Sequence, residues 1–197
     1  ISLPTSPSPN GMQVMLRDFG GTMTPFLGGP EQLIVRAGTR FGARISIPPV
    51  RTDDLGRVYI SRLLQGRLNG VLMRWPLLEF NPGTPGSPKI AAAVSNGSTI
   101  QLKGLTASYQ IKEGQYFSII IGGKRYMHMA TENVTATSGG TATINIFPLL
   151  RKAVSIDDVV EIAQPMIEGI ISPGDELSWE IASNRFMNIN FTIMESA

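Results

Sequence analysis

One histidine and two aspartate pairs are the side chains of this sequence best suited to chemistry. His128 is the only histidine, so a nucleophilic triad or an imidazole metal site would have to use it. It stands between Met127 and Met129 in a β-prone run, and no nearby motif offers it a partner. We therefore interpret His128 as a packed or solvent-facing strand residue. The chain has no cysteine, which excludes thiolate metal sites and disulfides.

The aspartate pairs are Asp53-Asp54 and Asp157-Asp158. Neither pair has the alternating spacing of a calcium loop. We interpret Asp53-Asp54 as negative charge at the start of a helix, and Asp157-Asp158 as a turn before a strand. The sequence thus predicts no catalytic, cofactor-binding or metal-binding residues and no enzyme activity.

Four glycine pairs are the remaining candidates for chemistry, because glycine-rich loops can bind phosphate groups. A P-loop also needs a following helix and a lysine, and none of the four pairs has them. We predict that they are turns. The pairs are Gly20-Gly21, Gly28-Gly29, Gly122-Gly123 and Gly139-Gly140.

The composition is typical of an all-β protein with many turns. Of 197 residues, 42% are hydrophobic and only 16% are charged, with 21 Gly and 14 Pro. The low charge favours a surface partly covered by neighbouring subunits. The net charge of +2 is too small to indicate nucleic-acid binding. The apolar runs are far shorter than the roughly 20 residues of a membrane helix, so we expect no membrane insertion and a soluble protein made in the cytoplasm.

The first half of the chain predicts a β layer with one helix. Residues 1–10 are a Pro/Ser-rich segment, which we expect to lie against a neighbouring subunit. Gly20-Gly21 is expected to turn the chain after the first strand, and Pro48-Pro49 to end the strand Phe41–Ile47. The other strands are expected at Met12–Phe19 and Gln32–Arg36.

A helix is predicted at residues 53–69, capped by Thr52 or Asp53. Its apolar stripe is expected to cover the β layer. Pro76 lies within the next predicted strand, Val71–Phe80, and places that strand at an edge or bend. The stripe consists of Leu55, Val58, Tyr59, Leu63 and Leu64.

A linker follows at residues 81–88, where three prolines and two glycines fall within eight residues. Five short strands beyond it predict a small barrel at residues 85–165. These strands are Thr99–Lys103, Tyr116–Ile121, Lys124–Ala130, Thr141–Phe147 and Asp158–Ala163. One alternative is a platform for single-stranded nucleic acid, with stacking aromatic and basic side chains. That platform would consist of Tyr116, Phe117, Tyr126, Lys103, Lys124 and Arg125.

The last thirty residues return to alternating strands. Strands are expected at Met166–Ile171, at Leu177–Ala182 and at Phe186–Ile193, with turns at 173–176 and at Ser183-Asn184. The final strand must join a sheet, and residues 1–84 are its natural partner. We therefore predict a mainly β fold: a split β-sandwich or barrel domain of residues 1–84 and 166–197 with one helix, and a barrel inserted at 85–165. In the final strand one face consists of Met187, Ile189, Phe191 and Ile193.

Four stretches resemble the distal tail protein of siphovirus-type bacteriophages, in the branch whose collar domain carries an inserted OB-like barrel. Arg125-Tyr126, with the run from Thr141 to Leu150 and Arg151 after it, is similar to the family's strand, glycine turn and strand ending in xPxLR. At the barrel entry Gly114 fits the family's turn, whereas Gln115 replaces its usual acid. The other stretches are Ser61–Leu64 with Val71–Leu78, Ile111–Ile119, and Asn188–Ser196.

This resemblance covers about residues 40–197 and implies a structural role in a virion. Distal tail proteins form homo-hexameric rings between the tail tube and the hub or tip of the baseplate, and DNA only passes through the channel. The implied partners are five further copies, the tail tube protein, a tail hub or tip protein, and receptor-binding or side-fibre proteins. An alternative is that the OB-like barrel recognises a carbohydrate receptor on the host.

Overall fold

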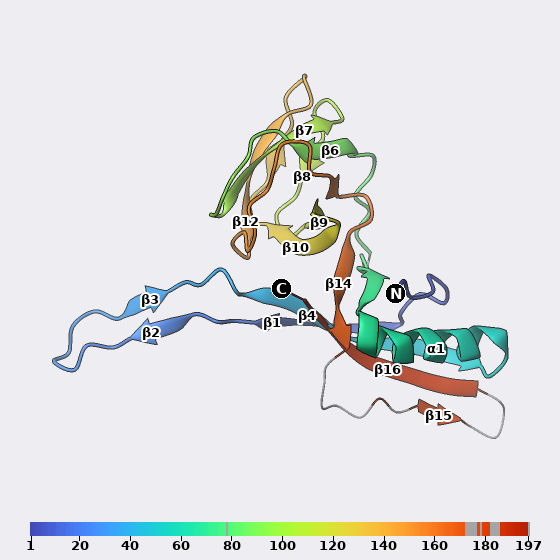
Figure 1. Cartoon of the computed structure of the whole chain (residues 1–197). Helices are drawn as coiled ribbons and strands as arrows, with labels where there is room; N and C mark the ends of the chain where they lie inside the picture. Colours follow the sequence, from blue (N-terminus) through green and yellow to red (C-terminus); the bar gives the residue numbers. More distant parts are fainter. Residues whose placement is uncertain (78, 172–176, 178, 182–185, 197) are drawn as a thin grey trace.

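The computed structural model describes residues 1–77, 79–171, 177, 179–181 and 186–196. Within these residues the protein is mainly β, with one helix and a nearly closed, barrel-like sheet (Figure 1), so the predicted fold class is confirmed. Two six-stranded sheets contain most of the strands. The predicted turns at 173–176 and at Ser183-Asn184 lie outside the described residues.

The first sheet, here called the split sheet, is built from both ends of the chain. All its strand pairs are antiparallel, in the order β1-β4-β16-β14-β5, and β15 pairs with the first half of β16 on the side that β14 occupies further along. The strands are β1 (Gly11–Arg17), β4 (Arg40–Arg51), β5 (Val71–Arg74), β14 (Met166–Ile171), β15 (Trp179–Ile181) and β16 (Phe186–Glu195).

Strands β4 and β16 form the centre of this sheet because their apolar residues alternate in register. Ala43 pairs with Ile193 and Ile45 with Phe191, and all four side chains are buried. The face that the sequence predicts for the final strand is therefore confirmed, and β4 buries a matching alternating face. Burying such alternating faces against one core is what specifies the register.

Pro48-Pro49 does not end β4, contrary to the prediction. The strand continues to Arg51, and its pairing with β16 shifts register between Ile47 and Val50. Proline lacks an N–H group for the ladder, and a bulge is a position where that missing donor is tolerated. The two prolines therefore lie in an irregular part of a long strand.

Helix α1 spans Asp54–Asn69, and Asp53 is its N-cap. The Asp53 carboxylate accepts a hydrogen bond from the Leu55 amide. The buried face of the helix includes two glycines. A Cβ at Gly66 would overlap the Val71 side chain, and a Cβ at Gly56 would overlap a backbone oxygen of β4. Glycine thus allows the helix to approach the split sheet closely.

The predicted apolar stripe of α1 is only partly correct. Tyr59 and Leu63 are buried, but Leu55, Val58 and Leu64 are exposed. The close approach at the glycines narrows the buried face of the helix. Apolar side chains on both flanks consequently remain in contact with solvent.

The first three residues of the N-terminal segment lie along β5 of their own chain. Leu3 is buried, its amide donates to the Leu72 carbonyl, and the Leu72 amide donates to the carbonyl of Ile1. A guanidinium nitrogen of Arg62 donates to the Ser2 carbonyl. These residues therefore cover the outer edge of β5, and the expected contact of residues 1–10 with a neighbouring subunit stays a prediction.

The region around the predicted linker also differs from expectation in detail. β5 ends at Arg74, ahead of Pro76, and the Trp75 amide donates to the Pro165 carbonyl. The last three residues of the predicted linker belong to β6 (Gly86–Ile90), which the sequence did not indicate.

The second sheet, here called the barrel sheet, has six strands in the order β13-β9-β10-β12-β7-β6, rather than the five predicted. Its ends meet, because Lys89 forms a bridge with Val159 and the Ile90 amide donates to the Asp158 carbonyl. Gly122-Gly123 forms the predicted two-residue turn, with φ of 58° and 79°. The remaining strands are β7 (Thr99–Leu105), β9 (Tyr116–Ile121), β10 (Lys124–Ala130), β12 (Ala142–Phe147) and β13 (Val160–Glu161), with a separate pair β8 (Gln110–Ile111) and β11 (Val134–Thr135).

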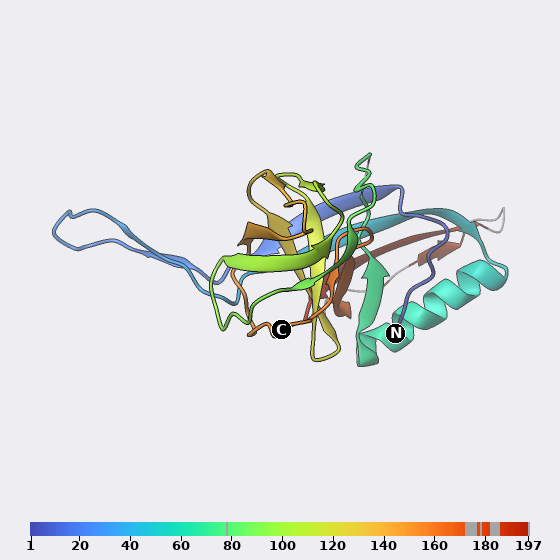
Figure 2. The ribbon, with the colours of Figure 1, turned by 90° about the horizontal axis from the view of Figure 1, so that it is seen from above.

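Residues 18–39, here called the arm, extend away from both sheets (Figures 1 and 2). Gly20-Gly21 is not a turn, contrary to the prediction, and the chain runs on into β2 (Gly21–Met23). β2 pairs with β3 (Gln32–Ile34), and the chain reverses between them. The arm is therefore a two-stranded ribbon that prolongs the β1–β4 hairpin.

Candidate functional site at the junction of the two sheets

His128 is a buried packing residue on β10. Its Nδ1 lies 2.9 Å from the Pro148 carbonyl oxygen, which can only accept, so Nδ1 carries the proton. Burial, together with the positive charge of Arg151, lowers the pKa of His128 to about 3. Nε2 is buried without a hydrogen-bond partner among the described residues. The ring is therefore neutral at physiological pH, and the Phe117 ring packs beside it, with centroids 6.0 Å apart.

Each aspartate of the two pairs has a structural partner. Asp53 caps α1 and Asp54 binds Arg57, as expected for charge at a helix start. Asp157 pairs with Lys103 at 2.8 Å, and Asp158 accepts from the amide of residue 155 at 2.7 Å. The part of the chain that the structure describes has no group of three acidic or histidine side chains that could hold a metal ion.

The six residues of the possible nucleic-acid platform do not share a surface. Phe117 and Tyr126 are buried in the barrel, and Tyr116 packs against the split sheet. Arg125 is paired with Glu161, and Lys103 with Asp157. Of the six, Lys124 alone is exposed. These side chains therefore cannot stack bases along a basic groove.

An apolar cluster instead joins the barrel sheet to the split sheet. The ring centroid of Phe41, in β4, lies 5.4 Å from that of Tyr116 and 6.2 Å from that of Phe147. Tyr116 and Phe147 both belong to the barrel sheet. Trp75 lies 5.1 Å from Tyr116. Met127 of β10 is fully buried within the core of the split sheet. The two sheets thus share one hydrophobic core at their contact.

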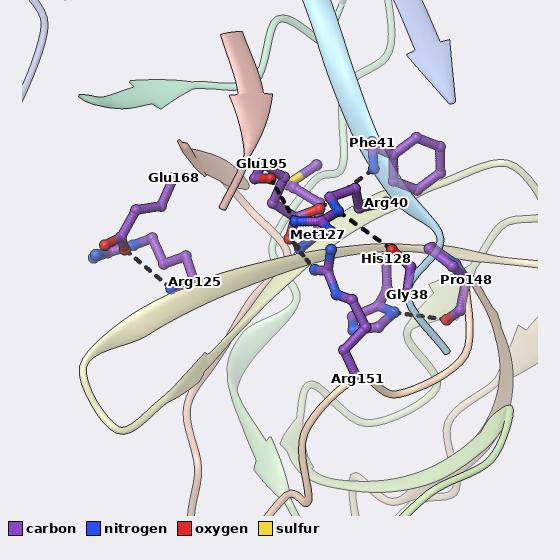
Figure 3. Close-up of polar contacts among 10 residues, drawn as sticks. All are labelled: Gly38, Arg40, Phe41, Arg125, Met127, His128, Pro148, Arg151, Glu168 and Glu195. Atoms are coloured by element: carbon purple, nitrogen blue, oxygen red, sulfur yellow. Dashed lines mark hydrogen bonds and ion pairs between the residues drawn. The ribbon is translucent and has the colours of Figure 1, made fainter. Parts of the chain in front are cut away.

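Glu195, the last residue of β16, forms the polar centre of this junction (Figure 3). Its carboxylate binds the guanidinium of Arg151 and accepts from the amides of Met127, at 2.7 Å, and Phe41, at 3.4 Å. The side chains of Glu195 and Arg151 are 0% and 5% exposed. Burial raises the pKa of Glu195 more than the arginine and the amides lower it. One carboxylate therefore links β4, β10 and the segment after β12.

A second carboxylate network lies nearer the start of β10. Arg125 and Glu161 form an ion pair at 3.0 Å, and the Arg125 amide donates to Glu168 of β14 at 3.0 Å. Glu161 also accepts from the Ser118 hydroxyl at 2.7 Å, and that hydroxyl oxygen accepts from the Met166 amide. These bonds connect the barrel sheet with the first residue of β14, where the chain returns to the split sheet.

Two open grooves flank the junction. One, of about 310 Å³, lies beside Trp75 and Tyr116, and the other, of about 540 Å³, lies between Val35 at the base of the arm and Phe147. Neither groove collects a set of titratable groups suited to acid–base chemistry. The apolar cluster and the two carboxylate networks instead fix the orientation of the barrel sheet on the split sheet.

Arg151 was noted in the sequence as part of a motif, whereas Glu195 was not identified. A signal for Glu195 exists, since it continues the inward alternation of Ile189, Phe191 and Ile193 on β16. A charged residue at an inward position requires a buried partner. The sequence could not show which cation that partner is.

The sequence matches no known family and no curated protein. In the part of the chain that the structure describes, no helix is long and apolar enough to cross a membrane.

Proposed function

We propose that this chain is a ring-forming structural protein of a bacteriophage tail, the distal tail protein between the tail tube and the host-recognition tip. In this proposal residues 1–84 and 166–197 form the collar and residues 85–165 the barrel that projects outward. The protein acts through assembly rather than catalysis, and it resides at the distal end of the virion tail.

The observation that carries the proposal is a sheet completed by both ends of the chain, with a barrel inserted between its halves. This is the order of parts that the resemblance implies. A junction made of a shared core and a buried ion pair also suits a connector, because it transmits position rigidly from one sheet to the other. Strand β1 is an open edge of the split sheet, since it pairs with β4 alone among the described strands.

Mass photometry and negative-stain electron microscopy of the purified full chain test this function. We expect a species of about six times the 21.3 kDa chain mass, or six-fold rings at the ends of tail tubes when the tube protein is added. A chain that stays monomeric at high concentration and forms no ring on tubes would contradict the proposal.

The carbohydrate-binding alternative gains no support from the barrel surface. A sugar that stacks on an aromatic ring needs that ring exposed, but Phe117 and Tyr126 are buried, and Tyr116 and Phe147 pack against Phe41. Tyr109 is half-buried, and its hydroxyl donates to the Pro82 carbonyl. A glycan array would use the whole chain, because Met127 belongs to the core of the split sheet.

A further inference from the structure

Three Asn-Gly pairs occur in the chain, and in this dipeptide the side-chain amide can react with the following backbone nitrogen. The pairs are Asn10-Gly11, Asn69-Gly70 and Asn96-Gly97. Glycine makes its own nitrogen the most accessible nucleophile of this kind, because it has no Cβ to shield the nitrogen or to restrict φ and ψ. By sequence the three pairs are equivalent, so the fold must distinguish them.

Two of the pairs are held by regular structure. Gly11 is the first residue of β1 and pairs with Ser46, whose carbonyl accepts the Asn10 amide at 3.0 Å. Asn69 is the last residue of α1, and its side-chain nitrogen donates to the Gln65 carbonyl at 3.2 Å. A reaction at either pair therefore requires that the strand end or the helix end open first.

The third pair lies in the loop before β7, and both of its reacting groups are unpaired. Asn96 is exposed, and its side chain has no hydrogen bond among the described residues. The Gly97 amide donates to none of the described residues either, and the φ of Gly97 is 121°, a value that favours glycine. A Cβ at Gly97 would meet no atom within 4 Å, so the space beside its backbone is open.

We propose that Asn96-Gly97 is a site of self-modification, at which the asparagine converts to aspartate or isoaspartate through a succinimide. The Gly97 nitrogen attacks Cγ of Asn96. The N–Cγ bond forms as the Cγ–Nδ2 bond breaks, and the amide proton leaves with Nδ2 as ammonia. Water then opens the ring at either carbonyl, adding a hydroxyl to the carbon and a hydrogen to the nitrogen. This chemistry goes beyond the proposed tail function and does not rest on it.

The loop is tied to the junction of the two sheets, which gives the modification a structural consequence. The Gly97 carbonyl accepts the amide of Leu150 at 2.9 Å, and Leu150 is buried. The next residue is Arg151, whose guanidinium binds Glu195. Isoaspartate adds one methylene to the backbone ahead of Gly97, so the Gly97 carbonyl shifts away from the Leu150 amide. The modification therefore loosens the segment that carries Arg151.

Trypsin separates the three pairs, because they fall in different peptides: residues 1–17, 68–74 and 90–103. The purified full chain is incubated at mildly alkaline pH, once folded and once in urea. Mass spectrometry of the digests detects the rise of about 1 Da that accompanies replacement of an amide by an acid. We expect the folded chain to react at residues 90–103 about tenfold faster than at either other peptide, because no helix or strand has to open there. In urea the three rates should be similar.

A folded chain that reacts equally fast at all three pairs would overturn the proposal. So would a folded chain that stays unmodified at residues 90–103 while the sample in urea reacts there. The matched control is Asn96→Gln, because the longer glutamine side chain does not close a succinimide. Residues 90–103 of this variant should keep their mass, and a mass rise in them would place the reaction at another residue.

Hydrogen exchange of the Leu150 amide tests the structural consequence. The isoaspartate chain, separated by ion exchange through its added negative charge, should exchange this amide about tenfold faster than the unmodified chain. Asn96→Asp has the same charge on a normal backbone and should exchange as the unmodified chain does. Equal exchange rates in the isoaspartate chain and Asn96→Asp would refute the loosening of the junction.

Discussion

The stability of this protein should depend on pH through its single histidine. The folded-state pKa of His128 is about 3, whereas an unfolded histidine titrates near 6.5. As the pH falls below about 6.5, the unfolded chain binds a proton that the folded chain does not, so stability is lost. At pH 5 the difference is about 1.5 pH units at ~1.4 kcal/mol each, or about 2 kcal/mol relative to pH 7.5.

The assay is urea unfolding at pH 7.5 and pH 5, followed by the fluorescence of the tryptophans, of which Trp75 is buried at the junction. The control is His128→Asn, whose side-chain amide can still donate to the Pro148 carbonyl but does not titrate. Glu195 acts in the opposite sense, because its pKa is raised and stability grows as it protonates on acidification. Both chains keep Glu195, so the difference between them isolates the histidine.

We expect the original chain to lose about 2 kcal/mol more than His128→Asn between the two pH values. The asparagine chain is expected to be less stable at pH 7.5, because it fills less of the site, but that offset does not affect the comparison. Equal losses in the two chains would refute the reasoning. They would mean that the folded protein protonates the ring as readily as the unfolded chain does.

Three further substitutions test the packing. Glu195→Ala should lower the free energy of unfolding in urea by about 3–5 kcal/mol, because it leaves a buried arginine unpaired. Glu195→Gln keeps an acceptor for that arginine and should lower the free energy of unfolding less. Equal losses in the two variants would count against the network. Gly140→Ala should lower the melting temperature by the equivalent of about 2 kcal/mol, because its φ is 71° and a Cβ would overlap a backbone oxygen of β7. Gly139→Ala, whose Cβ would make only an ordinary contact with the Thr137 side chain at 3.8 Å, should change the melting temperature little, and a matching loss would contradict this account. Leu3→Ala should lower the urea midpoint by the equivalent of about 2–3 kcal/mol, and an unchanged midpoint would show that residues 1–3 do not stay on β5.

Much of the strand content could be predicted because alternation is a local property. The bounds of β9, β10 and β14 were predicted as observed, and the inward faces of β4 and β16 follow directly from period two. The cap of α1 and the Gly122-Gly123 turn were equally readable, since both depend on a few neighbouring residues.

The wrong predictions of turns and strand ends fall where pairing with a strand distant in the sequence overrides the local residue pattern. Gly20-Gly21 resembles a turn, yet the chain continues straight because β3 pairs alongside it. Pro48-Pro49 resembles a strand end, yet β16 continues the ladder across a bulge. The exposure of Leu64 could not be predicted, since the close packing of α1 determines it.

The sequence by itself determined the β class, the single described helix and the return of the last strand to the first half of the chain, because periodicity and turn residues act over short distances. The tertiary structure alone decided which side chains meet at the junction of the two sheets and where the arm and helix α1 lie. It set Glu195 against Arg151, across 44 residues of chain, and it placed the arm and helix α1 toward opposite ends of the molecule. Such placements depend on which buried faces meet, and that is settled only when the whole core packs.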